Sequence, residues 1–295
     1  MHIGLVAVIS TVIAIVVIQT SDFNNSCEIS NDYPTRAFNY SADKMTKSGQ
    51  EFSTTIVTGL YDIKRQDRSF EEYKHWFRRT LKIPIPMIVF CKSENVAWIR
   101  KARGSREIVI VEEESIPLEH LVNKISEILP SMRQGRPDVE WVNKRYIATQ
   151  YSKAIWLKRG IQCNPYNSHF FFWVDAGVSR FFTGGQPKTP LPLLQNTNLL
   201  PDKLYISSTK FLPLVKLMTE NIIVGSQIPF VMGTVFGGRI TTVNRMCDAM
   251  LDILYKTMLN KCRVDNEQVA FGLIFKEHPD WFELLDQSHC NVACL

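Results

Sequence analysis

From Thr54 onward, the chain alternates between short apolar runs and longer stretches whose apolar residues recur at helical spacing. Runs rich in β-branched residues predict strands, and the amphipathic stretches predict helices. The predicted strands cover residues 54–60, 87–91, 106–111, 170–174 and 203–208. The predicted helices cover residues 69–81, 93–103, 117–129, 139–159, 209–220, 241–259 and 264–275. Residues 221–225 are predicted to be extended, residues 229–239 form an apolar run that ends in paired glycines, and the tail is expected to add a last strand.

Strands that alternate with helices predict βαβ units joined by right-handed crossovers. We therefore expect an α/β fold with a Rossmann-like, mostly parallel central sheet and flanking helices. The carboxyl ends of parallel strands meet at one edge of the sheet, and ligands bind there in open α/β sheets. The loop after the first strand and the loop after residue 174 are therefore expected to lie at the same edge.

The segment FFFWVDAGVSR, at residues 170–180, is the clearest candidate for a strand that delivers a functional side chain. Its apolar run is typical of a strand that is covered on both faces. Asp175 follows directly, and an ionised carboxylate is costly to bury without partners, so it should emerge at the strand end. An Asp in this position is also common as a helix cap or turn residue.

The first 19 residues contain no Asp, Glu, Lys or Arg and are mainly Val, Ile, Ala and Leu. About 20 such residues span a bilayer as a helix, so we interpret residues 1–19 as a signal-anchor, with a cleaved signal peptide as the alternative. Residues 20–50 are polar and carry glycosylation sequons at Asn24 and Asn39, which indicates a flexible luminal stem. Residues 51–295 then form the folded domain.

Composition narrows the class of protein. The 295 residues are 45% hydrophobic and 21% charged, which is typical of a folded domain with a full core. The net charge of +5 is too modest to indicate a nucleic-acid partner, but it is compatible with an anionic small ligand. The seven cysteines have no zinc-site spacing, and their odd number leaves at least one outside intramolecular pairs.

Two further segments could bind a ligand. TGLYDIKR, at residues 58–65, follows the first strand, where backbone groups and Asp62 could meet a base or ribose and Lys64 or Arg65 could meet phosphate. An ordinary turn at Gly59 is the alternative. In MGTVFGGR, at residues 232–239, glycines allow close approach of a ligand and Arg239 could bind an anion, although a bulge or tight turn explains the glycines equally well.

Two residues near the C-terminus are weaker candidates. Glu267, in the segment DNEQ, could be a catalytic or acceptor-binding carboxylate, but a carboxylate at a helix start is usually a cap. His278 could be a metal partner, although a solvent-exposed polar residue is the simpler interpretation.

The segments TIVTGLYDIKR, SFEEYKHWFRRTLKIPIPMIVFCKSE, FFFWVDAGVSRF, FGGR and DNEQ together resemble the HtrL/YibB-like glycosyltransferase family, from about Thr54 to Leu285. WVDAG is the most specific part. More loosely, YSKAIWLKRG followed by FFFWVDAG is similar to the helix and strand that precede the Asp-x-Asp motif in glycogenin-like transferases of the GT-A fold. This resemblance implies a GT-A enzyme that takes a nucleotide-sugar donor and transfers the sugar to a glycan or glycoprotein acceptor. Together with the predicted anchor, stem and sequons, it leads us to expect a single-pass membrane protein of the Golgi or endoplasmic reticulum with a luminal domain, with a secreted protein as the alternative.

The resemblance also implies roles for single residues. Asp175 would touch metal or ribose, Lys153 would lie near the pyrophosphate, and Glu267 would face the acceptor. The resemblance leaves an inverting or a retaining reaction open, and Glu267 would serve as the base if the reaction is inverting. Gly237 and Gly238 would shape the sugar pocket. The complete set of expected donor-binding residues is Thr58, Gly59, Tyr61, Asp62, Arg65, Lys153, Gly177, Gly237, Gly238 and Arg239.

Gly177 departs from the family pattern because Asp-x-Asp transferases carry a second acid at this position. Mn²⁺ is a hard cation that wants several oxygen ligands, and only Asp175, with His278 as a distant candidate, is offered here. Arg180, Arg239 or Lys188 could take over the charge of the diphosphate instead. The same departure leaves open a protein that has lost catalysis and acts as a binding partner in the secretory pathway.

Overall fold

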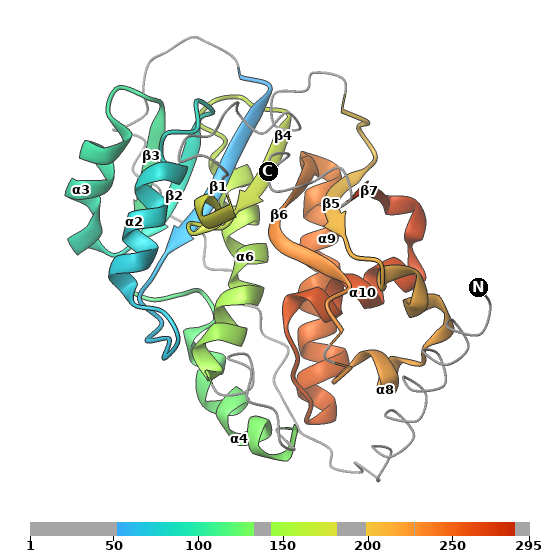
Figure 1. Ribbon diagram of the computed structural model, residues 1–295. Coiled ribbons are helices and arrows are strands. Elements are labelled where there is room, and N and C mark those ends of the chain that lie inside the picture. Colours follow the sequence, from blue (N-terminus) through green and yellow to red (C-terminus); the bar gives the residue numbers. More distant parts are fainter. Residues whose placement is uncertain (1–51, 133–142, 182–198, 227, 287–295) are drawn as a thin grey trace.

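The computed structural model describes residues 52–132, 143–181, 199–226 and 228–286 (Figure 1). Its strands are β1 (Thr54–Leu60), β2 (Met87–Cys91), β3 (Ile108–Glu112), β4 (Phe170–Val174), β5 (Leu204–Ser208), β6 (Val231–Arg239) and β7 (Phe282–Asp286). Its α-helices are α2 (Phe70–Thr80), α3 (Ser93–Arg103), α4 (Val122–Met132), α6 (Lys144–Cys163), α8 (Glu220–Ile223), α9 (Ile240–Asp252) and α10 (Glu267–Glu277). Short 3₁₀ turns lie at Glu119–Leu121, Val178–Phe181, Leu212–Leu217, Leu259–Lys261 and Pro279–Trp281, and a π-helical turn at Ile253–Met258 extends α9.

The seven strands form one sheet in the order β3-β2-β1-β4-β6-β5-β7. β6 runs antiparallel to both of its neighbours, and every other pair of adjacent strands is parallel. The order 3-2-1-4 in the first half is that of a Rossmann-like unit. The predicted α/β fold with a mostly parallel sheet is therefore confirmed, and the parallel register of β1 and β4 brings their carboxyl ends to one edge.

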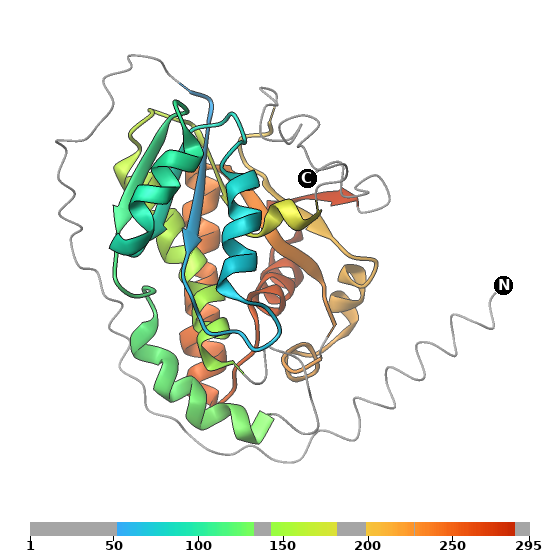
Figure 2. The ribbon, with the colours of Figure 1, turned by 60° about the vertical axis from the view of Figure 1, so that its left-hand side comes forward.

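Helices cover both faces of the sheet, as the two views show (Figures 1 and 2). On β4, Phe171 and Trp173 join the core beneath α4, α6 and α9, whereas Phe172 and Val174 join the core beneath α2 and α3. This alternation is the period of two expected for a strand buried on both sides. At Gly160, α6 lies so close to β1 that an added Cβ would be 2.8 Å from Val57 Cγ2.

Local sequence signals explain several of these elements. Ser69 caps α2 in a capping box with Glu72, as its position before a helical pattern predicts. The side chain of Asn143 caps α6 by accepting hydrogen bonds from the backbone N–H groups of Arg145 and Tyr146. Arg103, at the end of α3, is fully buried and donates hydrogen bonds to four backbone carbonyls, those of Leu81, Ile83, Ile85 and Glu107.

Most predicted elements are confirmed to within a few residues, but two assignments are wrong. The helix predicted at 209–220 is only a 3₁₀ turn at Leu212–Leu217, because Pro213 interrupts it. Residues 221–223, expected to be extended, belong to α8. The helix expected at 241–259 is confirmed, although it changes to π-helical and 3₁₀ turns after Asp252. The apolar run at 229–239 forms strand β6 from Val231 through Arg239, so its paired glycines lie within a strand.

The predicted anchor and stem lie outside the described residues, as do Asn24, Asn39 and Lys188. Within the part of the chain that the structure describes, no helix combines the length and apolar character needed to cross a bilayer. Cys262 is disulfide-bonded, whereas Cys91, Cys163 and Cys247 are free.

Candidate active site

A cleft opens at the carboxyl edge of the sheet, between the loop after β1 and the end of β4. Its walls also include the first turn of α2 and one side of α6. It is lined by Gly59, Leu60, Tyr61, Asp62, Ile63, Arg65, Arg68, Phe70, Tyr73, Tyr146, Thr149, Gln150, Lys153, Asp175, Ala176, Gly177 and Arg180. Two segments that were expected to share one edge of the sheet therefore meet here.

Asp175 projects into this cleft with its two carboxylate oxygens in different environments. The indole N–H of Trp173 donates to Oδ1 at 2.6 Å, and Lys153 Nζ lies 3.0 Å from the same oxygen. The Asp175 backbone N–H donates to the Thr234 carbonyl, which fixes the residue against β6. Among the described residues no partner is found for Oδ2, and the side chain is 29% exposed. One oxygen is thus held in place and the other can accept a hydrogen bond from a ligand.

Lys153 connects the cleft to the buried start of α10. Its Nζ lies 2.8 Å from Glu267 Oε1 and donates to the Gly233 carbonyl at 2.9 Å. Gly233 is required for this approach, because a Cβ there would lie 2.4 Å from Glu267 Oε1. The Glu267 side chain is only 2% exposed, and its Oε2 atom has no hydrogen-bond partner among the described residues.

Burial and charge shift the pKa of both members of this pair upward. Burial lowers the pKa of Lys153, but the carboxylates of Asp175 and Glu267 outweigh burial and hold it above its ordinary value. Burial raises the pKa of Glu267, and the opposing effect of Lys153 only partly offsets this. Lys153 is therefore a permanent cation at neutral pH. It neutralises a carboxylate that would be costly to bury alone.

The cleft carries a surplus of positive charge. Its lining includes four cationic side chains (Arg65, Arg68, Arg180 and Lys153) and two carboxylates. Asp67 binds Arg65 and also lies 3.5 Å from Arg68, and Asp62 is paired with Lys64. Within the described residues Arg180 has no carboxylate partner and stacks over the Phe181 ring at 4.5 Å. Its guanidinium is therefore available to an anionic group, and guanidinium groups bind phosphate well.

A continuous stack of aromatic rings supports the inner wall. The ring centroids of Tyr61 and Trp156 are 5.3 Å apart, those of Trp156 and Trp173 are 5.6 Å apart, and both pairs are nearly parallel. Gly59 makes room for this stack, because a Cβ would lie 3.1 Å from the Trp156 ring. Burial, together with the charge of Glu113, raises the pKa of the Tyr61 hydroxyl well above its ordinary value, so Tyr61 is neutral.

The structure brings together most of the site residues that were predicted between residues 58 and 177. Gly59, Tyr61, Asp62, Arg65, Lys153, Asp175 and Gly177 all line the cleft. Thr58 does not, because strand alternation turns its fully buried side chain away from the opening. Glu267 touches Lys153 but is buried behind it, so it cannot face an acceptor directly as expected.

Gly237, Gly238 and Arg239 are not among the residues that line this cleft. Arg239 pairs with Phe170, the first residue of β4, whereas Asp175 follows the last, and five strand residues correspond to about 17 Å. Gly238 and Gly237 pair with Phe171 and Phe172 within β4. The two glycines serve strand packing. A Cβ at Gly237 would lie 2.2 Å from the Phe171 carbonyl oxygen, and one at Gly238 would lie 2.5 Å from the Lys203 carbonyl oxygen.

His278 is also too far away to share a ligand with Asp175. It follows the last residue of α10, whereas Glu267 begins this helix, and 11 residues correspond to about 16 Å of helix. Its ring instead stacks on Trp281, with the centroids 4.1 Å apart. The expected pairing of Asp175 with His278 around a metal is therefore wrong.

The residues of the cleft do not fit a Mn²⁺ site. Among the described residues there is no group of three or more His, Cys, Asp or Glu side chains that could hold a metal. Asp175 is already neutralised by Lys153. A Cβ at Gly177 would lie 3.2 Å from the Tyr73 ring, so a second acid would have to displace this ring. The cationic side chains of the cleft are the groups that can balance the charge of a diphosphate.

Several residues of the site were not predicted from the sequence. Arg68 and Tyr73 enter the cleft from the start of α2, and Gly233 allows Glu267 to approach Lys153. Arg68 could have been suspected, since it follows the TGLYDIKR segment and adds to its positive charge. Gly233 gives no comparable signal, because its role depends on a side chain 34 positions further along the chain.

Comparisons with known proteins match one family and several solved structures. A family model described as "Bacterial protein of unknown function (HtrL_YibB)" matches residues 52–292. No curated protein matches the sequence. Core-mannan synthase A from Aspergillus fumigatus, in its Mn/GDP form, is similar with a TM-score of 0.49 at 8% identity over 90% of this chain and 81% of that chain. The 4-diphosphocytidyl-2C-methyl-D-erythritol synthase from Anaerococcus prevotii is similar with a TM-score of 0.40 at 12% identity over 80% and 87%. Structural similarity with TM-scores below 0.5 and identities of 8% and 12% does not assign a function to this chain.

Proposed function

The chain belongs to the HtrL_YibB family, and from this premise we propose that it is a transferase of the GT-A type that binds a nucleotide-sugar donor. The family description names no activity, so the proposal rests on the cleft itself. The observation that carries it is a partly exposed carboxylate, Asp175, at the carboxyl edge of a Rossmann-like sheet, in a cleft where cationic side chains outnumber carboxylates and Arg180 has no carboxylate partner among the described residues. This is the edge at which nucleotides bind in such sheets.

Different side chains of the cleft can bind different groups of the donor. Arg65, Arg68 and Arg180 provide guanidinium groups for the diphosphate, whose negative charge grows as it leaves. Oδ2 of Asp175 can accept a hydrogen bond from a hydroxyl of the ribose or of the sugar, while Lys153 and Trp173 hold Oδ1 in place. Lys153 therefore acts on the donor by positioning Asp175.

In the proposed reaction, these contacts hold the donor while its sugar is transferred. An acceptor hydroxyl oxygen forms a bond with the anomeric carbon of the sugar, and the bond from this carbon to the diphosphate oxygen breaks. The nucleoside diphosphate leaves with the electron pair, and the hydroxyl proton passes to water or a nearby base. Arginine side chains stabilise the leaving diphosphate in a site without bulk water more strongly than they would in solution.

A binding screen with the full chain tests the proposal. Nucleoside diphosphates and nucleotide sugars are titrated by calorimetry, and sugar transfer or donor hydrolysis is followed by release of the diphosphate. We expect at least one nucleotide to bind. Arg180→Gln should weaken its binding roughly tenfold to a hundredfold, because a charge-assisted hydrogen bond is lost. Asp202→Asn, a change in an exposed turn, is the matched control.

Asp175→Asn separates function from structure. Asparagine keeps the shape of the side chain and can still accept the Trp173 hydrogen bond, and Lys153 keeps Glu267 as its partner. We expect turnover to be lost while the free energy of unfolding changes by about 1 kcal/mol or less. Absence of binding for every nucleotide contradicts the proposal. Binding without transfer or hydrolysis for any donor favours the alternative of a non-catalytic binding protein.

The cellular location is a separate proposal, namely that residues 1–19 anchor the folded domain on the luminal side of the Golgi or endoplasmic reticulum membrane. Its support is the uncharged apolar sequence of that segment and the disulfide at Cys262, since disulfides persist in oxidising compartments. The full chain is then expected in the membrane fraction, with Asn24 and Asn39 carrying glycans that an amidase removes. Recovery in the cytosolic fraction without glycans contradicts it.

A further inference from the structure

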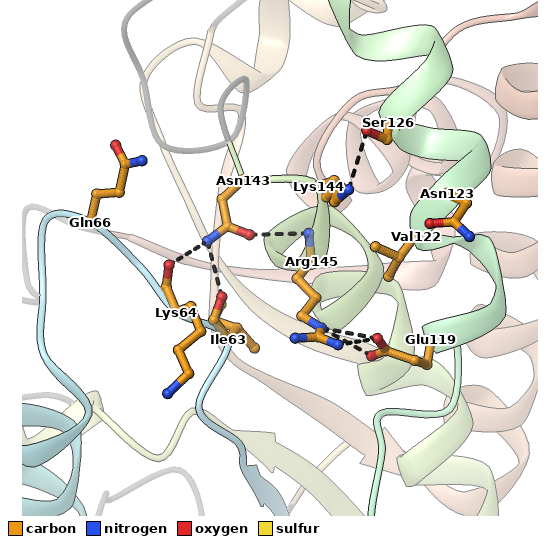
Figure 3. Close-up of a pocket in the computed structure, with 10 residues that line it drawn as sticks. All are labelled: Ile63, Lys64, Gln66, Glu119, Val122, Asn123, Ser126, Asn143, Lys144 and Arg145. Carbon is orange, nitrogen blue, oxygen red and sulfur yellow. Dashed lines mark hydrogen bonds and ion pairs between the residues drawn. The ribbon is translucent and has the colours of Figure 1, made fainter.

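A second, larger pocket adjoins the cleft on the other side of the loop after β1 (Figure 3). It has a volume of about 750 Å³, within the roughly 300 to 1,000 Å³ typical of small-molecule sites. By the same measure the cleft has a volume of about 100 Å³. The pocket is lined by Ile63, Lys64, Gln66, Glu119, Val122, Asn123, Ser126, Asn143, Lys144 and Arg145.

The loop after β1 forms the wall between the two spaces. Asp62 and Arg65 line the cleft, Lys64 and Gln66 line the pocket, and Ile63 lines both. A molecule in the pocket would therefore lie beside a diphosphate held by Arg65 and its neighbours. This is where a group that attacks the donor would have to be placed.

Asn143 fixes this wall in place. Its amide N–H₂ group donates to the backbone carbonyls of Ile63 at 3.2 Å and Lys64 at 3.4 Å. Its Oδ1 accepts the backbone N–H groups at the start of α6. Lys64 has a φ of 56°, in the left-handed region that is unfavourable for a residue with a Cβ. The hydrogen bonds from Asn143 hold the loop in this conformation, so the wall is preformed.

The pocket presents an unneutralised positive charge. Of its three cationic side chains, Arg145 is paired with Glu119 and Lys64 is paired with Asp62 behind the wall. Lys144 is different, because its Nζ lies 3.4 Å from the neutral Ser126 Oγ and no carboxylate partner is present among the described residues. An anionic group entering the pocket would find Lys144 available.

Apart from Ile63 and Val122, the remaining lining residues are polar, and none of the lining residues is aromatic. Gln66 and Asn123 offer amide groups that can both donate and accept hydrogen bonds, and neither has a partner within the described part of the chain. Such groups match sugar hydroxyls. A nucleobase is usually recognised with the help of a stacking ring, which the cleft offers nearby at Tyr61 and the pocket does not.

We propose that this pocket binds the acceptor and that the acceptor is a saccharide bearing an anionic group, a phosphate or a carboxylate. The acceptor role rests on the proposed function. Lys144 contacts the anionic group, and Gln66 and Asn123 contact sugar hydroxyls. A hydroxyl of this saccharide then reaches the donor past the Ile63 side chain, where the pocket and the cleft meet because Ile63 lines both.

The test uses the full chain and three probes, glucose 6-phosphate, glucuronate and glucose, with binding measured by ligand-observed NMR at millimolar concentration. We expect the phosphate or the carboxylate probe to bind and glucose to bind at least tenfold more weakly. Lys144→Gln should weaken binding of the anionic probe roughly tenfold to a hundredfold. Lys124→Gln, on α4 outside the pocket and paired with Glu127, is the matched control and should leave binding unchanged.

A nucleotide titration distinguishes failure of this inference from failure of the proposed function. If a nucleoside diphosphate binds with the same affinity to the wild type and Lys144→Gln, and does not displace the anionic sugar, the acceptor site is supported. If the nucleotide displaces the sugar, or if Lys144→Gln weakens nucleotide binding, the pocket belongs to the donor site and the inference is wrong. If nucleotides bind but none of the sugars does, it is also wrong. If the sugar binds through Lys144 but no nucleotide binds, the proposed function fails and with it the acceptor role.

Discussion

Replacing Lys153 by methionine should destabilise the protein strongly, because this side chain is the partner of a deeply buried carboxylate. Methionine keeps the length and apolar character of the stem but removes the ammonium group. Glu267, 2% exposed, would lose its only cationic partner among the described residues, and the Gly233 carbonyl would lose a donor at 2.9 Å. Removing one member of a buried ion pair costs about 3–5 kcal/mol. For a domain of this size that corresponds to a fall in Tm of roughly 6 to 20 °C.

The loss should depend on pH, with a sign that follows from Glu267. Burial already raises the pKa of this carboxyl, and loss of Lys153 would raise it further. A carboxyl group with a raised pKa in the folded state stabilises the protein fully below its ordinary pKa near 4.3, and this contribution is lost as the pH rises through the folded-state value. Lys153→Met should therefore be least stable, relative to the wild type, at neutral and alkaline pH and recover on acidification toward pH 5.

Urea unfolding at pH 5 and pH 8 measures both effects. Lys158→Met is the matched control, because Lys158 lies on the same helix but forms an exposed pair with Asp248, and it should cost less than about 1 kcal/mol. Combining Lys153→Met with Glu267→Gln should recover much of the loss, since no buried charge then remains unpaired. If Lys153→Met lowers the free energy of unfolding no more than the control does, at both pH values, then Lys153 does not stabilise a buried Glu267 carboxylate. Strict additivity of the two changes in the double variant would lead to the same conclusion.

Three further outcomes are expected. Arg103→Met should cost about 3–5 kcal/mol in urea unfolding, because several buried carbonyls lose a charged donor and the substitution fills only part of the space. Nucleotide affinity measured by calorimetry should not change when EDTA is added, because the cleft offers arginine side chains and no metal-ligand set. The hydrogen bonds from Arg65 lower the pKa of Asp67, so the contribution of this pair is present above about pH 4, the ordinary aspartate value, and is lost as the pH falls through the lowered pKa. Asp67→Asn should therefore differ most from the wild type in stability near neutral pH, and the two should converge in acid-unfolding measurements at low pH.

Each of these outcomes has a control or a contradicting result. Arg100→Met, an exposed change one turn earlier on α3, should have little effect, and an equal loss for both arginine variants would show that the buried carbonyls are not the cause. Nucleotide binding abolished by EDTA and restored by Mn²⁺ would contradict the cationic cleft. A constant difference between Asp67→Asn and the wild type across the acid range would contradict the proposed pairing with Arg65.

The part of the site that follows from local sequence pattern was predictable. An apolar run that ends in Asp175 indicates a strand that delivers a carboxylate to the sheet edge, and a parallel sheet places the loop after β1 beside it. Ser69 predicted the start of α2 for a similarly local reason, since a hydroxyl before an acidic first turn caps a helix.

The part that depends on contacts between distant segments was not predictable. Lys153 and Glu267 are 114 positions apart, and nothing in either segment shows that they meet behind Asp175. The role of Gly237 and Gly238 could not be predicted from the sequence either. Glycine is compatible with a ligand pocket or with close strand packing, and only the neighbouring carbonyls of Phe171 and Lys203 show that packing is the reason here.

The large pocket beside the cleft was not predicted from the sequence, because it too depends on contacts between distant segments. Lys64 was noted as a phosphate candidate, but it lines the pocket and not the cleft, its ammonium group is paired with Asp62, and Asn143 binds its backbone carbonyl. In the sequence, Lys144 is only one of several basic residues along the helix predicted at 139–159. Its significance depends on the absence of a nearby carboxylate among the described residues, which no periodicity reveals.

The central claim is that the cleft around Asp175 binds the diphosphate of a nucleotide sugar through its arginine side chains. Calorimetric titration of nucleoside diphosphates into the full chain and into Arg180→Gln tests this most directly, with Asp202→Asn as the control. We expect a nucleoside diphosphate to bind to the wild type and to the control. Its affinity for Arg180→Gln should be lower by roughly tenfold to a hundredfold. Equal affinity in all three proteins, or binding of no nucleotide to any of them, would contradict it.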